Sequence, residues 1–419
     1  MPERLEDHRR YFGLDALRGG MMMLGIVLHA AMLYLAASTL PVQTDANTSL
    51  VFDALFALIH SFRMPVFFVL AGFFAALLVE KRGLKGTYRN RAGRVLAPLL
   101  ASVVTVLPLT ILLVIDFSLS ARYGTHDLVP DMNDLQAFGQ AMVNKAAALG
   151  LAGGELPLAH LWFLYYLCYF YLLIPLCRAL VAASRPFEDR VKRCLASPLM
   201  LVGFALGTSA TLWPFHGGQL HEGFMFLKPH LPSLAYYGSF FVLGYVFHHY
   251  RGFLQALARD VKAYAVMAAF LFPLAQYASH LDNAVHGADV ARHLAAVLVN
   301  ALCTWALVYM FIGGALRWFD RNAPWIFYLS QASYWVFLVH MPLVLFAGWL
   351  LVPYDLPAVF KFTLVCAFTS AAALLTFHYW VQKTWLSVFL HGRRFDLAWP
   401  WRVVNSAPMS STTPGSKES

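Results

Sequence analysis

Long apolar runs follow one another along almost the whole chain, separated by shorter polar stretches. Each run has about 20 residues, the length that an α-helix needs to cross the hydrocarbon core of a bilayer. The pattern predicts an all-α integral membrane protein, a bundle of about ten transmembrane helices. The predicted spans are 17–38, 52–79, 95–115, 158–182, 196–214, 232–250, 262–280, 294–315, 325–351 and 358–382.

Basic residues gather in alternate connecting segments. The segment between the second and third spans is rich in Lys and Arg, whereas 39–50 contains none and 116–157 contains only Arg122 and Lys145. Cytoplasmic loops of membrane proteins carry an excess of Lys and Arg, so the alternation supports ten spans and places both termini in the cytoplasm. The same distribution accounts for the net charge of +9 without a nucleic-acid partner.

Composition agrees with a membrane protein. Hydrophobic residues make up 59% of the 419 and charged residues 13%, against about 45–50% and about 25% in soluble domains. We expect residues 1–390 to form one membrane domain and 391–419 a largely disordered cytoplasmic tail. The first apolar run has no cleavage site and is expected to remain as a helix. The five cysteines have neither metal-ligand nor disulfide spacing, so free buried thiols are expected.

Two ionisable residues interrupt the first span, Arg18 and His29. On a helix, 11 positions correspond to about 16.5 Å and leave the two residues about 20° out of line. One helix face therefore carries a cation near one membrane surface and an imidazole near mid-membrane, and groups at that depth commonly mark a pathway or a reaction centre. We expect both side chains to open onto one shared polar cleft.

Each residue has two interpretations. His29 is a general base, because imidazole titrates near neutral pH, or a neutral histidine hydrogen-bonded to a neighbouring helix. Arg18 binds a phosphate or carboxylate, or it reaches the membrane surface while paired with Asp15 one turn earlier.

The second span carries a further pair, His60 and Arg63, on one helix face. Arg63 is too deep to reach the surface, so we interpret it as an anion contact within the site, with a buried salt bridge as the alternative. Pro65 is expected to kink this helix. Arg89, Arg91 and Arg94 precede Pro98; they are explained by membrane orientation alone, or they also clamp nucleotide phosphates at the mouth of a cavity.

Other polar residues lie in later spans. His160 and Trp162 open the fourth span, and the ninth span holds His340 beside Pro342. We place His60, His160, Trp162 and His340 in the substrate site. Gly244 is expected to permit close helix packing. There is no P-loop, dinucleotide-binding turn, HExxH or GxSxG motif, so ATP hydrolysis, metalloprotease and serine-hydrolase chemistry have no support.

In combination, these motifs resemble the membrane acyltransferase-3 family. The resemblance runs from residue 11 to about residue 385. It rests on Leu14-Asp-Ala-Leu-Arg18 with His29, Phe62-Arg-Met-Pro-Val-Phe-Phe68 with Gly72, Arg91 and Arg94 before Pro98, His160-Leu-Trp-Phe-Leu, and Ser333-Tyr through His340-Met-Pro342. Within the family the chain is similar to a branch associated with succinylation of periplasmic glucans. Ala71 is a departure, because the family commonly has serine there.

The resemblance implies a multi-pass enzyme of the bacterial inner membrane with no permanently bound cofactor and no metal. A cytoplasmic acyl-CoA, succinyl-CoA by resemblance, would bind its phosphates near Arg18, Arg89, Arg91 and Arg94. His29 and Arg63 would be catalytic, and a periplasmic glucan or another glycan would accept the acyl group. Arg63 could also pair with the terminal carboxylate of a succinyl donor.

Two alternatives stay open at this point. One is O-acetyl transfer to another polysaccharide or a lipid head group, and the other is a proton-coupled transporter or exporter, which intramembrane His and Arg suit equally well. The sequence does not specify the oligomeric state, and a homo-oligomer is compatible with it.

Overall fold

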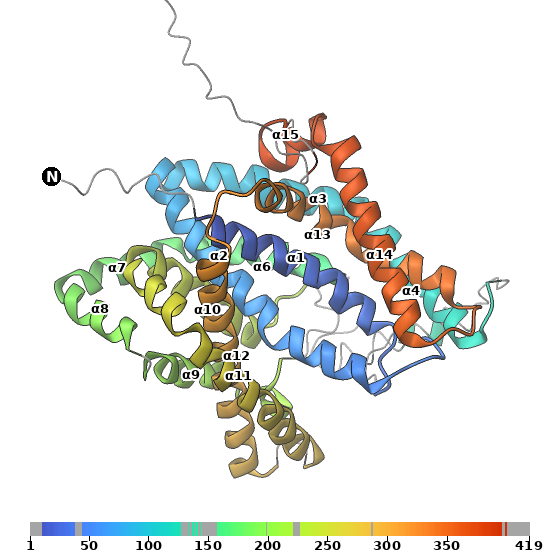
Figure 1. Cartoon of the computed structure of the whole chain (residues 1–419), viewed down its shortest axis with the longest axis horizontal. Helices are drawn as coiled ribbons and strands as arrows, with labels where there is room; N and C mark the ends of the chain where they lie inside the picture. The colour runs from blue at the N-terminus through green and yellow to red at the C-terminus, as the bar shows by residue number, and fades with distance from the viewer. Residues whose placement is uncertain are drawn as a thin grey trace, which may run out of the picture.

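The computed structural model describes residues 11–37, 44–126, 157–197, 199–220, 227–285 and 288–395, with isolated residues at 133, 136–137, 139–140, 144 and 399. Every regular element longer than one residue in these ranges is a helix (Figure 1). The first half comprises α1 (Phe12–Met32), α2 (Leu50–Arg91), the π-helical turn η1 (Ala92–Leu96), α3 (Ala97–Val104), α4 (Val106–Tyr123), η2 (Ala159–Leu161), α6 (Trp162–Leu172), α7 (Ile174–Ser184), η3 (Arg185–Phe187) and α8 (Glu188–Ala196).

The second half continues with helices of similar kind. These are α9 (Leu199–Leu212), η4 (His216–Gly218), α10 (Leu231–His249), α11 (Gly252–Ala284), α12 (Val290–Trp318), α13 (Pro324–Leu351), α14 (Ala358–Thr376), the π-helical turn η5 (Phe377–Val381) and α15 (Trp385–His391). Side-chain caps begin several of them: Ser49 accepts from Val51 N at the start of α2, and Asp289 accepts from Ala291 N at the start of α12.

Membrane-spanning length separates these helices into two groups. In the described part of the chain, seven helical segments are long and apolar enough to cross a membrane, or eight if the pair Ala159–Leu172 and Ile174–Leu195, bent by 49°, forms one span. All ten predicted segments are helical, but α9 has only 14 residues and α10 is not among the seven. The protein is therefore an all-helical membrane protein, while the count of ten and the cytoplasmic termini stay predictions.

The helix carrying the second predicted span is longer than expected. α2 runs for 42 residues and contains the buried Pro65, and it is interrupted at Gly83, whose φ of 66° lies outside the helical region. Beyond this break the helix carries the basic residues that were predicted to form a loop. Local backbone freedom at glycine thus turns the basic segment relative to the apolar part of α2.

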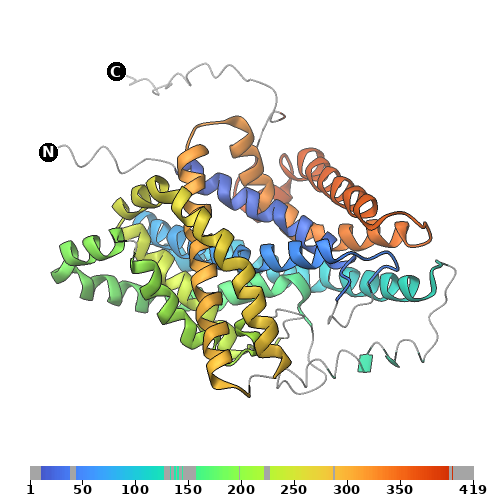
Figure 2. The ribbon, with the colours of Figure 1, turned by 60° about the horizontal axis from the view of Figure 1, so that its bottom comes forward.

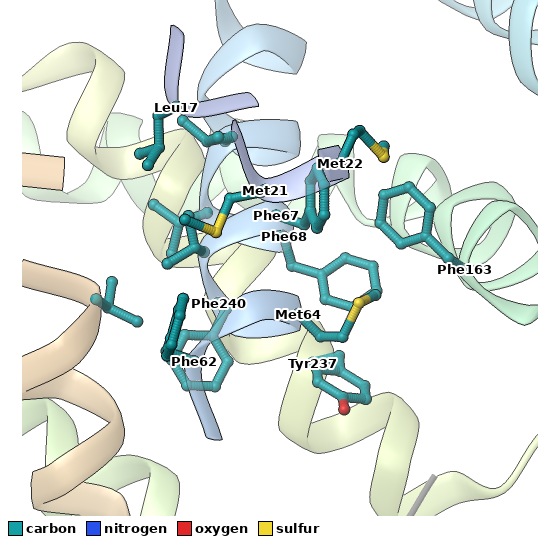
Figure 3. Close-up of a cluster of buried hydrophobic side chains, with 14 of the residues drawn as sticks. Leu17, Met21, Met22, Phe62, Met64, Phe67, Phe68, Phe163, Tyr237 and Phe240 are labelled. Atoms are coloured by element: carbon teal, nitrogen blue, oxygen red, sulfur yellow. The ribbon is translucent and has the colours of Figure 1, made fainter. Parts of the chain in front are cut away.

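α1 lies in the interior of the bundle. It packs against α13 and α2, α10 packs against α2, and α11 and α12 lie side by side along their lengths (Figure 2). Aromatic and sulfur-containing side chains of α1, α2, α6 and α10 form the packed centre (Figure 3). This arrangement brings the polar residues of α1 and α2 next to those of α6 and α13.

The cysteines are free within the structure, as predicted. Cys177 and Cys303 are buried, Cys168 and Cys366 are partly exposed, and Cys194 is exposed, so the expectation of five buried thiols holds fully at only two positions. Cys194 lies on α8, a short helix whose own residues are mainly charged and exposed. A polar helix of this kind leaves its cysteine at the surface.

Candidate functional site

An arginine-lined cavity of about 680 Å³ opens among α1, α2, η1, α6, α13 and α15. We call it the arginine cavity. Its lining contains five arginines, and no carboxylate occurs among the described residues that line it; the arginines are Arg18, Arg82, Arg91, Arg94 and Arg393. A space of this size with excess positive charge suits a multiply charged anion.

Arg18 is held in place at the edge of this cavity. Its guanidinium donates to Ser330 O at 3.3 Å and to Ser330 Oγ, and it lies 3.3 Å from Asp15 Oδ1. Ser330 Oγ donates in turn to Asp15 Oδ1 at 3.2 Å. The structure therefore contains the pairing with Asp15 that the sequence offered as one alternative, and it also leaves Arg18 lining the cavity.

The other predicted phosphate contacts divide between two spaces. Arg91 lies over the ring of Tyr171 at 5.0 Å, and Arg94 Nη1 donates to Val388 O at 2.8 Å, which ties η1 to α15. Arg89 lines a neighbouring cavity of about 790 Å³, the side cavity. Arg82, Asn90 and Arg94 border both spaces.

A much smaller cavity of about 40 Å³ lies deeper in the bundle. We call it the histidine cavity. It is lined by Leu28, His29, Arg63, Met64, Phe67, His160, Trp162, Phe163 and Phe337. The structure thus brings His29 of α1, Arg63 of α2 and His160 of η2 to one space, which holds little more than water.

His340 completes a group of three histidines. Its ring centroid lies 5.2 Å from that of His29 and 5.2 Å from that of His160. His60 is placed differently: it stacks on Phe56 at 5.5 Å and is not among the described residues that line the arginine, side or histidine cavity. His60 nevertheless lies close enough to His29 for the two rings to interact electrostatically, and its place in the substrate site stays a prediction.

Backbone carbonyl oxygens determine which nitrogen of two of these rings carries hydrogen. His340 Nδ1 lies 3.1 Å from Val336 O and 2.7 Å from Phe337 O, and His160 Nε2 lies 3.2 Å from Leu338 O. A carbonyl only accepts, so these nitrogens are the donors in the neutral rings. The opposite nitrogens, together with His29 Nδ1, are buried without a hydrogen-bond partner in the described structure, and His340 and His160 can each accept a proton there.

Arg63 of α2 packs tightly against α1. Its side chain is 6% exposed, its Nε donates to Met21 O at 3.2 Å, and its guanidinium lies 5.8 Å from the ring of Phe67. A Cβ on Gly25 would lie 2.6 Å from the guanidinium, so glycine at that position makes room for Arg63. The charge is thereby fixed beside the histidine cavity.

The arginine cavity and the histidine cavity are separate, contrary to the expected single cleft. Arg18 lines the arginine cavity and His29 the histidine cavity. Among the described residues, only Phe67 and Phe163 line both, with ring centroids 5.3 Å apart. Helical spacing correctly placed Arg18 and His29 toward one side of α1, but aromatic side chains from two other helices fill the space between them.

Several residues of the cavity wall were not predicted. Ser330 and Tyr334 of α13 line the arginine cavity, and Tyr334 Oη donates to Arg94 O at 2.8 Å. His391 and Phe395, in the segment predicted to be a disordered tail, line it as well. Ala71 is also part of this wall, so the serine common in the family would point its hydroxyl at this space. Of these residues, Tyr334 had a signal because it lies in one of the family motifs, and Ala71 had one because it departs from the family pattern.

A second missed polar residue is buried and is not among the described residues that line the arginine, side or histidine cavity. Lys361 on α14 donates to both carboxylate oxygens of Asp45 at 2.9 Å, and the side chains of both residues are 1% exposed. Its position inside an apolar run was a signal comparable to that of Arg63.

Comparison with known proteins agrees with the geometry. The model of the Acyl_transf_3 family, described as an acyltransferase domain, matches residues 11–378. The chain belongs to this acyltransferase-3 family. The resemblance inferred from the motifs is confirmed, and the protein is a membrane acyltransferase.

Curated relatives of this acyltransferase include Glucans biosynthesis protein C from Escherichia coli O139:H28 and from E. coli strain K12. Each is 27% identical over 361 residues, which cover 83% of this chain and 85% of the relative. No solved structure matches the chain. The arginine and histidine cavities lie within the residues matched by the family model, except for the part of the arginine cavity formed by α15 and the residues after it.

Proposed function

We propose that this acyltransferase moves a succinyl group from cytoplasmic acyl-CoA to a hydroxyl group of a periplasmic glucan. The observation that carries the proposal is the adjacency of two unlike spaces, the arginine cavity and the histidine cavity. The first suits the phosphates of a donor and the second suits proton transfer. Their meeting point at Phe67 and Phe163 is where the thioester would enter.

Donor binding would use the arginines. Guanidinium groups match phosphate oxygens in a bidentate fashion, and Arg18, Arg91 and Arg94 are held in position by Ser330, Tyr171 and Val388. Arg89, in the side cavity, would contact a phosphate that lies outside the main space. The narrow pantetheine arm would then point toward the histidine cavity.

The acyl transfer itself would use His29 as general base. An acceptor hydroxyl attacks the thioester carbonyl carbon as His29 takes the hydroxyl proton. The negative charge that develops on the carbonyl oxygen would be stabilised by Arg63, which lines the same cavity. The carbon–sulfur bond then breaks, and the proton passes from His29 to the CoA thiolate, so the products are an ester and free CoA. His160, Trp162 and His340 would border the acceptor.

The proposed orientation is supported by the sequence, and the proposed acceptor is supported by the names of the relatives. The alternation of basic segments supports an inner-membrane protein with ten spans and both termini in the cytoplasm, so the arginine-rich end of the bundle would face the cytoplasmic acyl-CoA. The name of the relatives, Glucans biosynthesis protein C, supports a glucan acceptor. Only the acyl group would change sides of the membrane.

Release of free CoA tests the proposal. Purified protein in nanodiscs, supplied with succinyl-CoA and a periplasmic glucan, is expected to release thiol and to produce succinylated glucan, measured by a thiol reagent and mass spectrometry. His29→Ala should lower this rate by about 100-fold to 10,000-fold, the usual contribution of a positioned base.

Two controls make the result decisive. His280→Ala removes an exposed histidine on α11 and should retain the wild-type rate. A parallel reaction uses acetyl-CoA in place of succinyl-CoA. Faster turnover of the acetyl donor would show that the protein is an acetyltransferase and would contradict the succinyl part of the proposal. No thiol release from wild-type protein with either donor would contradict acyl-CoA chemistry and leave the transporter alternative.

A further inference from the structure

The contact between Phe67 and Phe163 separates the arginine cavity from the histidine cavity. The two side chains are 4% and 7% exposed, and their ring centroids are 5.3 Å apart with the ring planes at 48°. These values lie in the range of packed aromatic pairs. Figure 3 shows the two rings side by side with Met22 of α1 nearby.

We propose that Phe67 and Phe163 form an aromatic partition that determines which acyl groups reach His29 and keeps water away from the thioester. The inference rests on the proposed function for its chemistry, but its geometry does not depend on it. Residues that only border one space cannot act in this way. Within the described chain, this pair alone borders both.

The surroundings of the pair explain why it holds its position and how it can open. Phe163 also contacts Phe68 at 5.3 Å and Phe337 at 5.6 Å, so it is anchored on the α6 side. Phe67 has the Arg63 guanidinium 5.8 Å from its ring centroid. Moving Phe67 breaks one aromatic pair and one cation–π contact and uncovers part of a buried ring. The binding of a polyanion to several arginines can offset this cost. Donor binding can therefore part the rings.

The partition would protect the thioester from hydrolysis. Water that reaches the carbonyl carbon of a bound acyl-CoA competes with the acceptor: it adds to the carbon, the carbon–sulfur bond breaks, and the products are a free carboxylic acid and CoA. A histidine that activates an acceptor hydroxyl activates water equally well. Closed rings keep bulk water in the arginine cavity from the histidines until a donor arm fills the opening.

Turnover measurements test the partition in the intact protein. Phe67→Leu and Phe163→Leu keep an apolar side chain, but leucine is smaller than phenylalanine and leaves a gap in the partition. Each is expected to raise severalfold the ratio of CoA released without glucan to CoA released with glucan, and to admit benzoyl-CoA, whose acyl group is wide. Phe170→Leu is the matched control, because Phe170 is also buried on α6 and is not among the described residues that line either cavity. Unchanged ratios in both variants would overturn the inference.

A second measurement works without any turnover. Leu28 lines the histidine cavity, so Leu28→Cys reports whether a water-soluble thiol reagent reaches that space. The introduced thiol is expected to react slowly in the otherwise wild-type protein and severalfold faster when Phe163→Ala is added, as read by peptide mass spectrometry. Equal reaction rates would overturn the partition.

Buried Cys177 and Cys303 serve as internal controls for folding. If they react in the Phe163→Ala protein, that protein has opened globally and the comparison is made with Phe163→Leu instead. Wild-type protein that releases no CoA from any donor would refute the proposed function, while the labelling result would still decide whether the partition exists.

Discussion

Arg63 is held by groups that its sequence position does not reveal. Its Nε donates to a carbonyl oxygen of α1, Met21 O, and Gly25 on the same helix leaves the space that the guanidinium occupies. The side chain borders the same cavity as His29. The fixed charge of Arg63 would act on a substrate group bound in this cavity beside His29, either a developing oxyanion or the carboxylate of a donor.

Substrate preference is expected to depend on Arg63. A succinyl donor carries a terminal carboxylate and an acetyl donor does not, and hydrogen bonds to charged groups contribute about 1.5–3 kcal/mol. Arg63→Ala should therefore lower kcat/KM for succinyl-CoA by about 10-fold to 100-fold more than for acetyl-CoA. Steady-state kinetics with both donors measure the difference, with the exposed Arg190→Ala as control. Equal losses would leave Arg63 with a general role and no role in selecting the donor.

At the scale of elements, the crossing of α2 and α10 positions one wall of the site. A Cβ on Gly72 would collide with Phe241 O, and a Cβ on Gly244 would collide with Val69 O. The backbones of the two helices therefore touch, and the expectation that Gly244 permits close packing is confirmed. α2 also carries Arg63 and Phe67, so the crossing helps to position both.

Gly244→Ala should separate these helices. The added methyl group has no space beside Val69 O, and overpacking of this kind costs about 1–3 kcal/mol. We expect a lower thermal midpoint in detergent together with reduced acyl transfer, since α2 moves. Gly207→Ala on α9 is the control, because a Cβ there meets nothing within 4 Å and alanine favours the helix. A Gly244→Ala protein as stable as the wild type would contradict the argument.

At the scale of the whole molecule, a buried ion pair connects distant parts of the chain. Lys361 of α14 contacts Asp45, which precedes α2, and Asp45 N donates to Leu33 O just beyond α1. Asn47 Nδ2 donates to Leu356 O and Asp355 Oδ1 between α13 and α14. These bonds join the ends of α1, α13 and α14.

Stability measurements on single and double variants test this connection. Asp45→Ala leaves a buried lysine uncompensated, which costs about 3–5 kcal/mol. Adding Lys361→Met removes the stranded charge, so the double variant should unfold at a higher temperature than Asp45→Ala alone. Glu188→Ala, which breaks an ion pair whose side chains are about half exposed, should leave the unfolding temperature close to that of the wild type, because solvent screens such pairs. Additive losses for Asp45 and Lys361 would show that the pair is not coupled.

The amino-acid sequence by itself determined the class of protein and much of its chemistry. Apolar runs of bilayer length require helices, because an unpaired backbone is too costly in lipid. Arg18, His29, Arg63, His160 and His340 stand out because charged and polar groups are rare in such runs. The motifs that contain them identified the family before any contact was known.

Only the tertiary structure decided how these residues are combined. Helical periodicity shows which residues share a face of one helix, but it does not show which faces of different helices meet. For that reason the joining of His340 to His29 and the placement of Arg89 in the side cavity could not be read from spacing. The division of the expected cleft by Phe67 and Phe163 depends on packing between α2 and α6, segments far apart in the chain.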